Sequence, residues 1–538
     1  MAAASSIRRA ERFLTREEAW ARRALTRASL AWWTASLSGR RGDYQRMERA
    51  DRAVNRHYSR IAAYERLLRL LDAPDADGLT RRRLQRQLLA YRSKQAPVEM
   101  LDRITRAEAD VQETYSTFRA QFDGHSASDN ELEDVLRASR DTERVKAAWD
   151  ARKQIGYAVA TDLRRLAHLR NEAARAMGFP DYWHAQLLLD ELDPETLIHT
   201  LDEVESATRQ PFEAMKADLD RHLAERFDVR TRDLRPWHYG DPFFQETPEV
   251  FAPPADPLYA EQDVVRLAAE TYRQLGFRNI DAILARSDLY PRAGKNQHAY
   301  AVDIDREGDV RTFLNVEPNA RWMGTLLHEL GHTIYQDGID RTELPYDLRD
   351  DPQGFLNEGF AMFCEQPTMH PAWLREMVGL SSSEAARLAP QLAAQDTASL
   401  LAFVRWCLTI VHFESAFYAD PDGDLNHLWW DLEERYQHVP RPEDRDAPDW
   451  AAKVHVATAP VYYQKYLLGR LFSAQLTRKI NADFGGWWEG RPRSGDYIKR
   501  ELFMPGARYA WSELVERVTG LPLGVESLAT AVAWPPAA

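Results

Sequence analysis

The stretch LLHELGHTIY, residues 326–335, decides how the rest of the chain is interpreted. It places His328 and His332 four residues apart, with Glu329 directly after the first histidine. On a helix this spacing brings both imidazoles to one face. Two imidazole nitrogens about 2.0–2.1 Å from Zn²⁺, beside a carboxylate that can accept a proton from water, form the core of a hydrolytic zinc site. The stretch therefore predicts a zinc-binding helix with Glu329 as general base.

The neighbouring residues favour this interpretation over an accidental match. Leucine, isoleucine and tyrosine flank the motif, so the helix is expected to lie inside the protein. Buried polar groups without partners cost about 1–3 kcal/mol each, and a metal ion would supply the partner. The alternative is a pair of core histidines satisfied by hydrogen bonds, in a chain that has 15 histidines.

A catalytic zinc ion needs a third protein ligand and an open fourth position. The segment FLNEGFAMFCEQ offers Glu358, and Glu365 two turns further along the same predicted helix is the competing ligand. Gly338 and Pro345 precede this segment, so the first helix should end near Gly338 and a second should begin before Glu358. We expect Glu358 to bind the metal because it stands nearer the start of the second helix.

Length and charge limit the class of protein. At 538 residues the chain exceeds the size at which a single core stops growing, so two lobes are expected. Hydrophobic residues make up 44% of the chain, which supports an ordered interior. The net charge of −13 argues against a nucleic-acid-binding surface.

The sequence also favours a cytoplasmic location. Its two cysteines, Cys364 and Cys407, form no disulfide framework and are typical of a reducing compartment. The first 20 residues carry scattered charges and no apolar core, so no signal peptide is expected. We find no run of about 18 apolar residues and expect no membrane span.

Helical periodicity dominates the chain. Segments rich in Arg, Ala, Leu and Glu predict long amphipathic helices. These segments are residues 7–122, residues 129–177, a helical pair over residues 194–227, and residues 381–417. A loop rich in proline and aromatic residues follows residue 227. Its His238 lacks metal-ligand spacing, so we expect a structural role for it.

Residues 297–316 depart from the helical pattern. Alternating apolar residues on either side of a turn at Gly308 predict a β-hairpin immediately before the zinc-binding helix. A strand beside a peptidase metal site can hold the substrate backbone by edge pairing. His298 and Ala299 are the residues expected to meet the substrate.

A second segment with reactive side chains, KVHVATAPVYYQKYLLGRLFSAQ, spans residues 453–475. A tyrosine hydroxyl or a histidine N–H can stabilise the oxyanion of carbonyl hydrolysis, and a lysine can hold a carboxylate. The alternative is that the tyrosines are core aromatics at helical spacing. The residues concerned are Lys453, His455, Tyr462, Tyr463 and Tyr466.

Three motifs together carry a resemblance to the angiotensin-converting-enzyme-like zinc metallopeptidases. They are HELGH at 328–332, NEGF around Glu358, and ERYQHVPRPEDRDAPDWAAKVH at 434–455. The resemblance extends over most of the chain through RNEAARAMGF at 170–179, PWHYGD at 236–241 and QHAYAVD at 297–303. It implies a mostly α-helical fold of the gluzincin type. The expected shape is an elongated, two-lobed ellipsoid with a deep central channel, roofed by N-terminal helices, and a small hairpin beside the zinc helix.

The resemblance also implies a role for each matching residue. One catalytic zinc ion would be bound by His328, His332 and Glu358, and Glu329 would act as general base and then as acid. His455 and Tyr466 match the positions that stabilise the tetrahedral intermediate. Lys453 and Tyr463 match those that hold the substrate's terminal carboxylate, and His298 and Ala299 match those that contact its backbone. One extra residue between His455 and Tyr466 leaves open whether Tyr462 or Tyr463 exchanges roles with the others.

Two departures from the family pattern have consequences. Glu433 and Lys465 stand where relatives that bind activating chloride carry arginine, which argues against chloride activation. Met362 replaces the aspartate one helical turn after the distal zinc ligand, so the groups that orient a ligand must come from elsewhere.

The combined interpretation is a zinc peptidase that releases C-terminal dipeptides from short peptides, without a nucleic-acid or membrane partner. The sequence leaves its oligomeric state open, and a monomer is favoured. One alternative is an endo-acting oligopeptidase, similar to the thimet and oligoendopeptidase group. The other is a catalytically silent peptide-binding protein. Within one peptidase domain, 1–538, the expected parts are an N-terminal helical lid at 1–122, the hairpin at 297–316, the zinc-binding helices at 323–366 and the substrate and oxyanion segment at 453–475.

Overall fold

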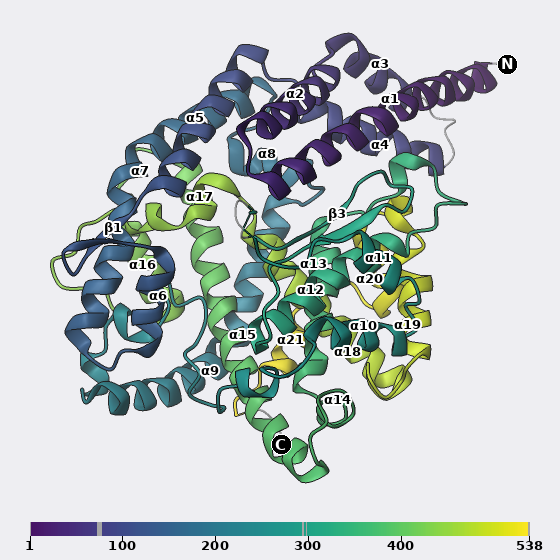
Figure 1. Ribbon diagram of the computed structural model, residues 1–538. Coiled ribbons are helices and arrows are strands. Elements are labelled where there is room, and N and C mark those ends of the chain that lie inside the picture. The colour runs from purple at the N-terminus through teal and green to yellow at the C-terminus, as the bar shows by residue number, and fades with distance from the viewer. Residues whose placement is uncertain (1, 73–77, 293–294, 297, 536–538) are drawn as a thin grey trace. The chain divides into compact units, whose positions relative to one another are not determined.

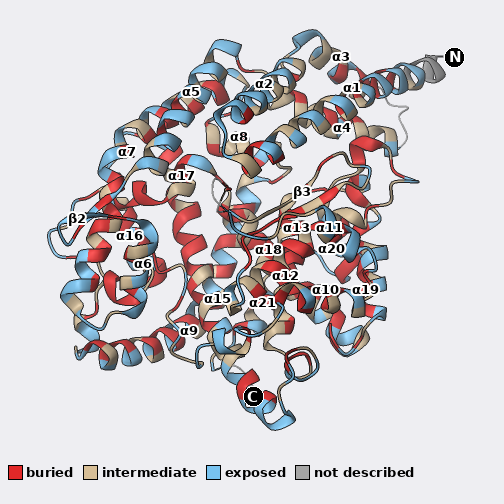
Figure 2. Ribbon diagram, viewed as in Figure 1, coloured by how far each residue is buried: buried red, intermediate tan, exposed pale blue. Residues whose placement is uncertain are grey.

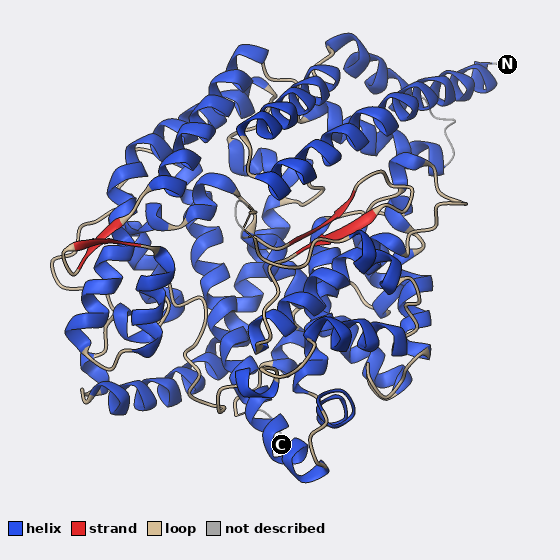
Figure 3. Ribbon diagram, viewed as in Figure 1, coloured by secondary structure: helices blue, strands red, loops and turns tan. Residues whose placement is uncertain are grey.

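The computed structural model describes residues 2–72, 78–292, 295–296 and 298–535. Within these ranges the chain forms 21 α-helices and two antiparallel sheets of two strands each (Figures 1 and 3). The predicted mostly α-helical fold is therefore confirmed. The chain divides into two compact units. Unit 1 comprises Met1–Gln95, Pro254–Ala389 and Leu468–Gly524, and unit 2 comprises Ala96–Pro253, Pro390–Leu467 and Val525–Ala538.

Unit 1 contains the N-terminal helices, the predicted hairpin and the helices of the predicted metal site. Its strands are β3 (Tyr300–Asp303) and β4 (Val310–Phe313). Its helices are α1 (Ala2–Ser38), α2 (Arg41–Tyr58), α3 (Ile61–Leu71), α4 (Gly78–Arg92), α10 (Val264–Gln274), α11 (Ile280–Arg286), α12 (Ala320–Asp337), α13 (Gly354–Glu365), α14 (Pro371–Trp373), α19 (Arg493–Ile498), α20 (Trp511–Thr519) and most of α18 (Tyr463–Phe484).

Unit 2 is built around longer helices. Its strands are β1 (Ala120–Phe122) and β2 (His125–Ala127). Its helices are α5 (Val98–Thr117), α6 (Asp129–Ala138), α7 (Thr142–Ala176), α8 (Tyr182–Leu189), α9 (Pro194–Phe227), α16 (Leu425–Gln437), α17 (Val454–Thr458), α21 (Glu526–Ala531) and most of α15 (Ser382–Ala419).

The helices expected over residues 7–122 are present as α1 to α5, but the expectation is wrong for residues 120–122, which form strand β1. Between α3 and α4, residues 73–77 lie outside the described residues. Pro97 precedes α5 directly, where its missing N–H costs no helical hydrogen bond.

Helix α12, which carries the zinc motif, begins three residues before the predicted start at residue 323 and ends where the sequence predicts. The Asn319 side chain caps the first turn by accepting a hydrogen bond from Trp322 N at 2.8 Å. Gly338 follows the last helical residue, in agreement with the predicted end. The leucines on either side of the motif are fully buried, so the helix lies inside unit 1 (Figure 2).

Two glycines allow α13 to approach its neighbours closely. A Cβ atom on Gly331 of α12 would lie 3.1 Å from the Cα of Ala361 in α13. On the other side of α13, a Cβ atom on Gly359 would lie only 2.5 Å from the carbonyl oxygen of Gly469 in α18. Because neither glycine has a side chain, α13 packs tightly between these two helices and presents Glu358 next to the zinc motif.

The predicted hairpin is also confirmed. Strands β3 and β4 pair in antiparallel register, with Tyr300 opposite Phe313 and Asp303 opposite Val310. On one face, the Thr312 hydroxyl of β4 forms a 2.6 Å hydrogen bond with the Thr333 hydroxyl of α12. The other face packs against Trp33 of α1. The hairpin is thus fixed to the zinc helix by a buried hydrogen bond.

One prediction about the helices is wrong. Residues 194–227 form the single helix α9 and not a helical pair. Pro211 lies inside it and removes one backbone hydrogen bond. Phe212, Met215 and Leu219 are fully buried along one face, and this packing outweighs the lost bond.

Helix α15 is long and apolar enough, by length and composition, to cross a membrane, and it alone among the described helices passes this test. Most of its apolar stretch is buried inside the protein, as in the core helix of a globular domain.

Candidate active site

Helices α12 and α13 bring the three predicted metal ligands together. The Nε2 atoms of His328 and His332 are 3.1 Å apart, and Glu358 Oε2 lies 3.6 Å and 3.9 Å from them. A tetrahedral ion with ligand bonds of about 2.0–2.1 Å separates its ligand atoms by about 3.3 Å. The spacing and the two-histidine, one-carboxylate donor set therefore fit Zn²⁺. Among the described residues, this is the group that meets the spacing of a metal site.

The outer nitrogen of each histidine is held by a polar side chain from α13. His328 Nδ1 donates to Glu365 Oε1 at 2.6 Å, and His332 Nδ1 donates to Asn357 Oδ1 at 2.9 Å. Asn357 is fixed in turn by donating to Asp351 Oδ2 at 3.2 Å. With both Nδ1 atoms engaged, both Nε2 atoms face the space where a metal would bind.

Glu365, the competing ligand in the sequence, thus lies behind His328. Burial by itself would raise the pKa of Glu365, but the hydrogen bond and charge of His328 lower it below the ordinary value. An ionised Glu365 can orient His328 and increase its basicity toward a metal. Met362 is apolar and buried and cannot form a hydrogen bond that orients a zinc ligand. Glu365 provides such a hydrogen bond to His328.

Glu329 lies on the same helix and is 9% exposed. Burial raises its pKa above the ordinary value, and the two histidines partly oppose this shift. A carboxylate with a raised pKa is a better proton acceptor near neutral pH. Its surroundings therefore suit the predicted general base.

The residues that precede β3 lie at an accessible sheet edge. His298 is exposed, and its backbone N–H donates to Asn296 Oδ1 at 2.9 Å. Within the described part of the chain, β3 pairs with β4 on one side and with no strand on the other. The outer edge of β3, next to His298 and Ala299, can accept an extended peptide.

In unit 2, the structure brings most of the predicted substrate residues into one cluster. The ring of Tyr463 lies 5.1 Å from that of His455 and 5.4 Å from that of Tyr466. Lys453 Nζ is 5.7 Å from the centre of the Tyr463 ring. The ring of Tyr462 lies 5.0 Å from that of Tyr466.

Gln245 joins this cluster and is the residue that the sequence did not indicate. Its Oε1 accepts a 2.6 Å hydrogen bond from Lys453 Nζ. Asp241 holds Gln245 by accepting from its backbone N–H at 3.0 Å and from its side-chain amide at 3.3 Å. A lone glutamine in a proline-rich loop carries no motif, so only the fold reveals its position.

Burial sets the electrostatics of this cluster. Lys453 is 6% exposed, and burial lowers its pKa to about 8 although Asp241 opposes the shift. Burial also raises the pKa of Tyr463 well above its ordinary value, so its hydroxyl stays protonated and can donate. Below about pH 8 the cluster therefore offers a buried cation and hydroxyl donors to an anionic ligand.

Three further residues singled out in the sequence have structural partners. Lys465 pairs with Asp190 at 2.7 Å, and Glu433 is buried, so neither position offers a free cation to chloride. His238 Nδ1 accepts from Arg235 N at 2.8 Å. Burial lowers the pKa of His238 to about 4, which agrees with the structural role expected for it.

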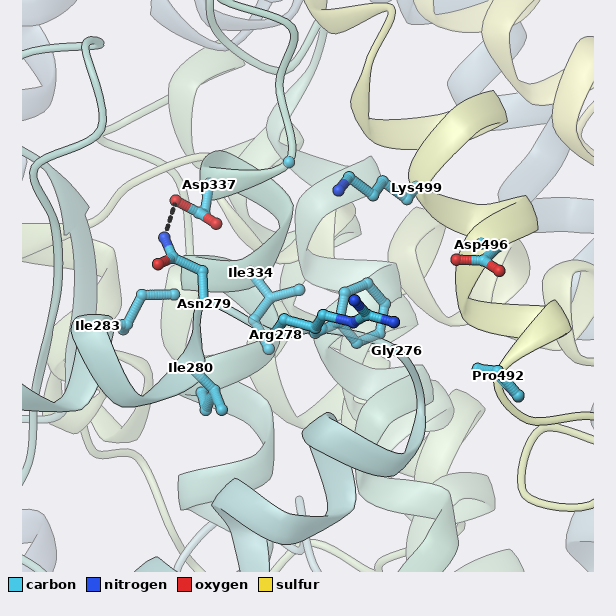
Figure 4. Close-up of a pocket in the computed structure, with 12 residues that line it drawn as sticks. Gly276, Arg278, Asn279, Ile280, Ile283, Ile334, Asp337, Pro492, Asp496 and Lys499 are labelled. Carbon is cyan, nitrogen blue, oxygen red and sulfur yellow. Dashed lines mark hydrogen bonds between the residues drawn. The ribbon is translucent and has the colours of Figure 1, made fainter.

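A separate pocket of about 390 Å³ opens at the C-terminal end of α12 (Figure 4). Ile280, Ile283 and Ile334 line it, and Asn279 donates to Asp337 at its edge at 2.8 Å. None of the predicted metal or substrate residues lines this pocket, so it is distinct from the metal centre.

Comparisons with known families agree with this site. The model of peptidase family M3 matches residues 135–526, which include all predicted metal ligands and the segment 453–475. The model of angiotensin-converting enzyme matches residues 4–235 and confirms the resemblance noted in the sequence. A comparison with curated proteins gives no match.

Proposed function

Because this chain belongs to peptidase family M3, a family of zinc metallopeptidases, we propose that it releases dipeptides from the C-terminus of short peptides. Its metallopeptidase character follows from the family, and short peptides are the substrate class that the family implies. The position of cleavage is the proposal, and it rests on the cluster around Lys453.

The observation that carries the proposal is a buried lysine whose ammonium group has no carboxylate of the described residues at ion-pair distance. Lys453 Nζ donates to the neutral amide of Gln245, and no carboxylate of the described residues forms an ion pair with it. Buried charges in proteins are normally paired, because an unpaired charge is costly to remove from water. The C-terminal carboxylate of a peptide would supply the pair, with Tyr463 and Gln245 as further donors. An enzyme that anchors this carboxylate cleaves at a fixed distance from the C-terminus.

The proposed mechanism assigns a task to each side chain. A Zn²⁺ ion held by His328, His332 and Glu358 would polarise the scissile carbonyl and lower the pKa of a water molecule. Glu329 accepts a proton from the attacking water and later delivers it to the leaving amine.

The negative charge that develops on the carbonyl oxygen needs hydrogen-bond donors. In the proposed mechanism His455 and Tyr466 supply these donors. Water is the nucleophile throughout, so no side chain forms a covalent intermediate. The edge of β3 at His298 and Ala299 holds the peptide backbone in an extended conformation.

Endo-acting cleavage is the competing proposal, as in an oligopeptidase of the thimet and oligoendopeptidase type. The match to peptidase family M3 over residues 135–526 is compatible with it, and the segment PVYYQKYLLG would serve either activity. The two proposals differ in whether the peptide's C-terminal carboxylate is required.

The experiment that decides is product analysis by mass spectrometry. A defined octapeptide is incubated as the free acid and as the C-terminal amide, each with and without a chelator. Stepwise loss of dipeptides from the free acid only, abolished by the chelator, is the expected result. Internal cleavage of both peptides would point to an oligopeptidase, and no cleavage by the zinc-loaded protein would favour the peptide-binding alternative.

A further inference from the structure

Val461 has a backbone conformation that valine rarely adopts. Its φ angle is 56°, in the left-handed region, which is a marked outlier for a β-branched residue. It lies between α17, which carries His455, and α18, which begins at Tyr463. Strained residues persist only where their surroundings hold them, and they are concentrated at functional sites. The groups that hold Val461 are therefore of interest.

Both peptide groups of Val461 are held by side chains. Its N–H donates to Glu414 Oε1 at 2.8 Å, and its carbonyl accepts from the Gln464 amide at 2.7 Å. Glu414 belongs to α15 and is 2% exposed. Of these two side chains, Glu414 is the one outside the segment, and it ties Val461 to the core of unit 2.

The other end of the same loop is held from α7. Arg170 Nη2 donates to the Ala457 carbonyl at 2.9 Å, and Arg170 Nη1 donates to the Tyr418 hydroxyl at 3.0 Å. Arg170 thus holds the last turn of α17, and Glu414 holds Val461 within the connection, residues 459–462, that leads from the predicted oxyanion histidine to α18. The connection begins with a hydrogen bond from the Ala459 N–H to the His455 carbonyl at 3.0 Å.

We propose that Glu414 is a positioning residue: its carboxyl group holds Val461 in the left-handed conformation and so sets the direction in which α18 presents Tyr463 and Tyr466. This inference rests on the proposed function of those tyrosines. Return of Val461 to a negative φ would rotate the first turn of α18 away from its present direction. A misplacement of about 1 Å in a catalytic group can cost about 100-fold in rate.

The protonation state of Glu414 indicates which variant preserves its role. Burial raises its pKa to about 8, while the Val461 N–H and the charge of Arg170 partly oppose the shift. Tyr182 and Tyr418 are the other titratable groups that interact with it. At pH 7 Glu414 is mostly a neutral acid that accepts through its carbonyl oxygen, which glutamine reproduces.

The test compares Glu414→Gln with Glu414→Met in the full-length, zinc-loaded protein. Glu414→Met keeps the size of the side chain but removes the acceptor. We expect it to lower kcat on the octapeptide by about 100-fold with unchanged zinc content. Glu414→Gln should keep at least half of the wild-type kcat at pH 7. If Glu414→Met does not fold, Glu414→Asp replaces it, because the shorter side chain cannot reach Val461.

A second substitution separates positioning from a general loss of stability. Glycine adopts the left-handed conformation without strain, so Val461→Gly should make the Glu414 hydrogen bond dispensable. We expect the double variant Glu414→Met/Val461→Gly to recover at least tenfold in kcat over Glu414→Met. If Glu414 only stabilised the fold, the added cavity at Val461 would lower activity further.

Gln395 provides a matched control on the same helix. Its side-chain oxygen accepts from the backbone N–H groups of Val250 and Phe251, both at 3.1 Å. Gln395→Met should lower thermal stability and leave kcat within twofold. A folded Glu414→Met protein with near-wild-type kcat, or a double variant no better than the single one, would overturn the proposal. An inactive wild-type protein would instead refute the proposed function.

Discussion

Single side chains decide the chemistry of the proposed site. In the proposed mechanism Glu329 is the proton acceptor for the attacking water. It is not one of the predicted zinc ligands. Glu329→Gln should therefore retain zinc and lose nearly all turnover, because the amide cannot accept the proton at neutral pH. Metal analysis and kcat on the octapeptide test this. Glu343→Gln, at an exposed position beyond α12, is the control. A Glu329→Gln protein with near-wild-type kcat would contradict the role of Glu329 as general base.

Lys453 controls the requirement for a free C-terminus. Loss of a hydrogen-bonded charge costs about 1.5–3 kcal/mol, so Lys453→Ala should raise KM for free-acid peptides by about 10- to 100-fold. Amidated peptides should be affected much less. Equal effects on both peptides would count against the carboxylate role.

The pKa of Lys453 adds a pH dependence. Burial lowers this pKa to about 8, so the ammonium group is charged below that pH and neutral above it. Binding of the carboxylate is therefore present below about pH 8 and is lost as the pH rises further. We expect kcat/KM of the free acid, which reports on the free enzyme, to fall above about pH 8. The ratio of free-acid to amide kcat/KM should stay constant with pH in Lys453→Ala.

At the scale of helices, glycines set the metal geometry. A Cβ atom on Gly359 would meet the Gly469 carbonyl, whereas Gly324, on α12, has no atom within 4 Å of its Cβ position. Gly359→Ala should destabilise the protein by about 1–3 kcal/mol and weaken zinc binding, because α13 and Glu358 must shift. Gly324→Ala, the control, should stabilise it by up to about 1 kcal/mol. Chemical denaturation and competition with a chelator measure both effects. Equal stability of the two variants would contradict the close packing of α13.

The elements also show what the sequence can and cannot predict. The spacing of His328 and His332 requires only helical geometry, so the local pattern was sufficient to pair them. Glu358 and Glu365 lie on one helix, and the pattern could not show that the second orients His328. Gln245 depends on hydrogen bonds from Asp241 within an irregular loop, which has no periodicity to detect. The single helix α9 depends on tertiary burial, which outweighs the local effect of Pro211.

For the whole molecule, two buried acids make stability depend on pH. Burial raises the pKa values of Glu414 and Glu433 to about 8 in the folded protein, against about 4.5 when they are exposed. Both acids are protonated in both states below about pH 4.5. Between about pH 4.5 and 8 only the unfolded chain ionises, so stability falls as the pH rises, by up to about 1.4 kcal/mol per pH unit for each group.

Glu433→Gln should therefore stabilise the protein at pH 8.5 and change little at pH 5. Thermal unfolding of both proteins across this range tests the expectation. Glu434→Gln, at the adjacent exposed position, provides the control for loss of charge. If the difference in unfolding temperature between wild type and Glu433→Gln does not grow with pH, Glu433 is ionised in the folded protein.

The division of the chain into interleaved stretches has a consequence for synthesis on the ribosome. His328, His332 and Glu358 are all translated before residue 390, but unit 1 also needs residues 468–524, including the Gly469 backbone against which α13 packs. Unit 2 in turn resumes with residues 525–538. Neither unit can complete its packing until its last stretch has left the ribosome. Contacts between distant stretches of the chain also slow folding. The nascent chain therefore completes the packing behind Glu358 only after residues 468–524 have been translated, long after the three predicted zinc ligands themselves.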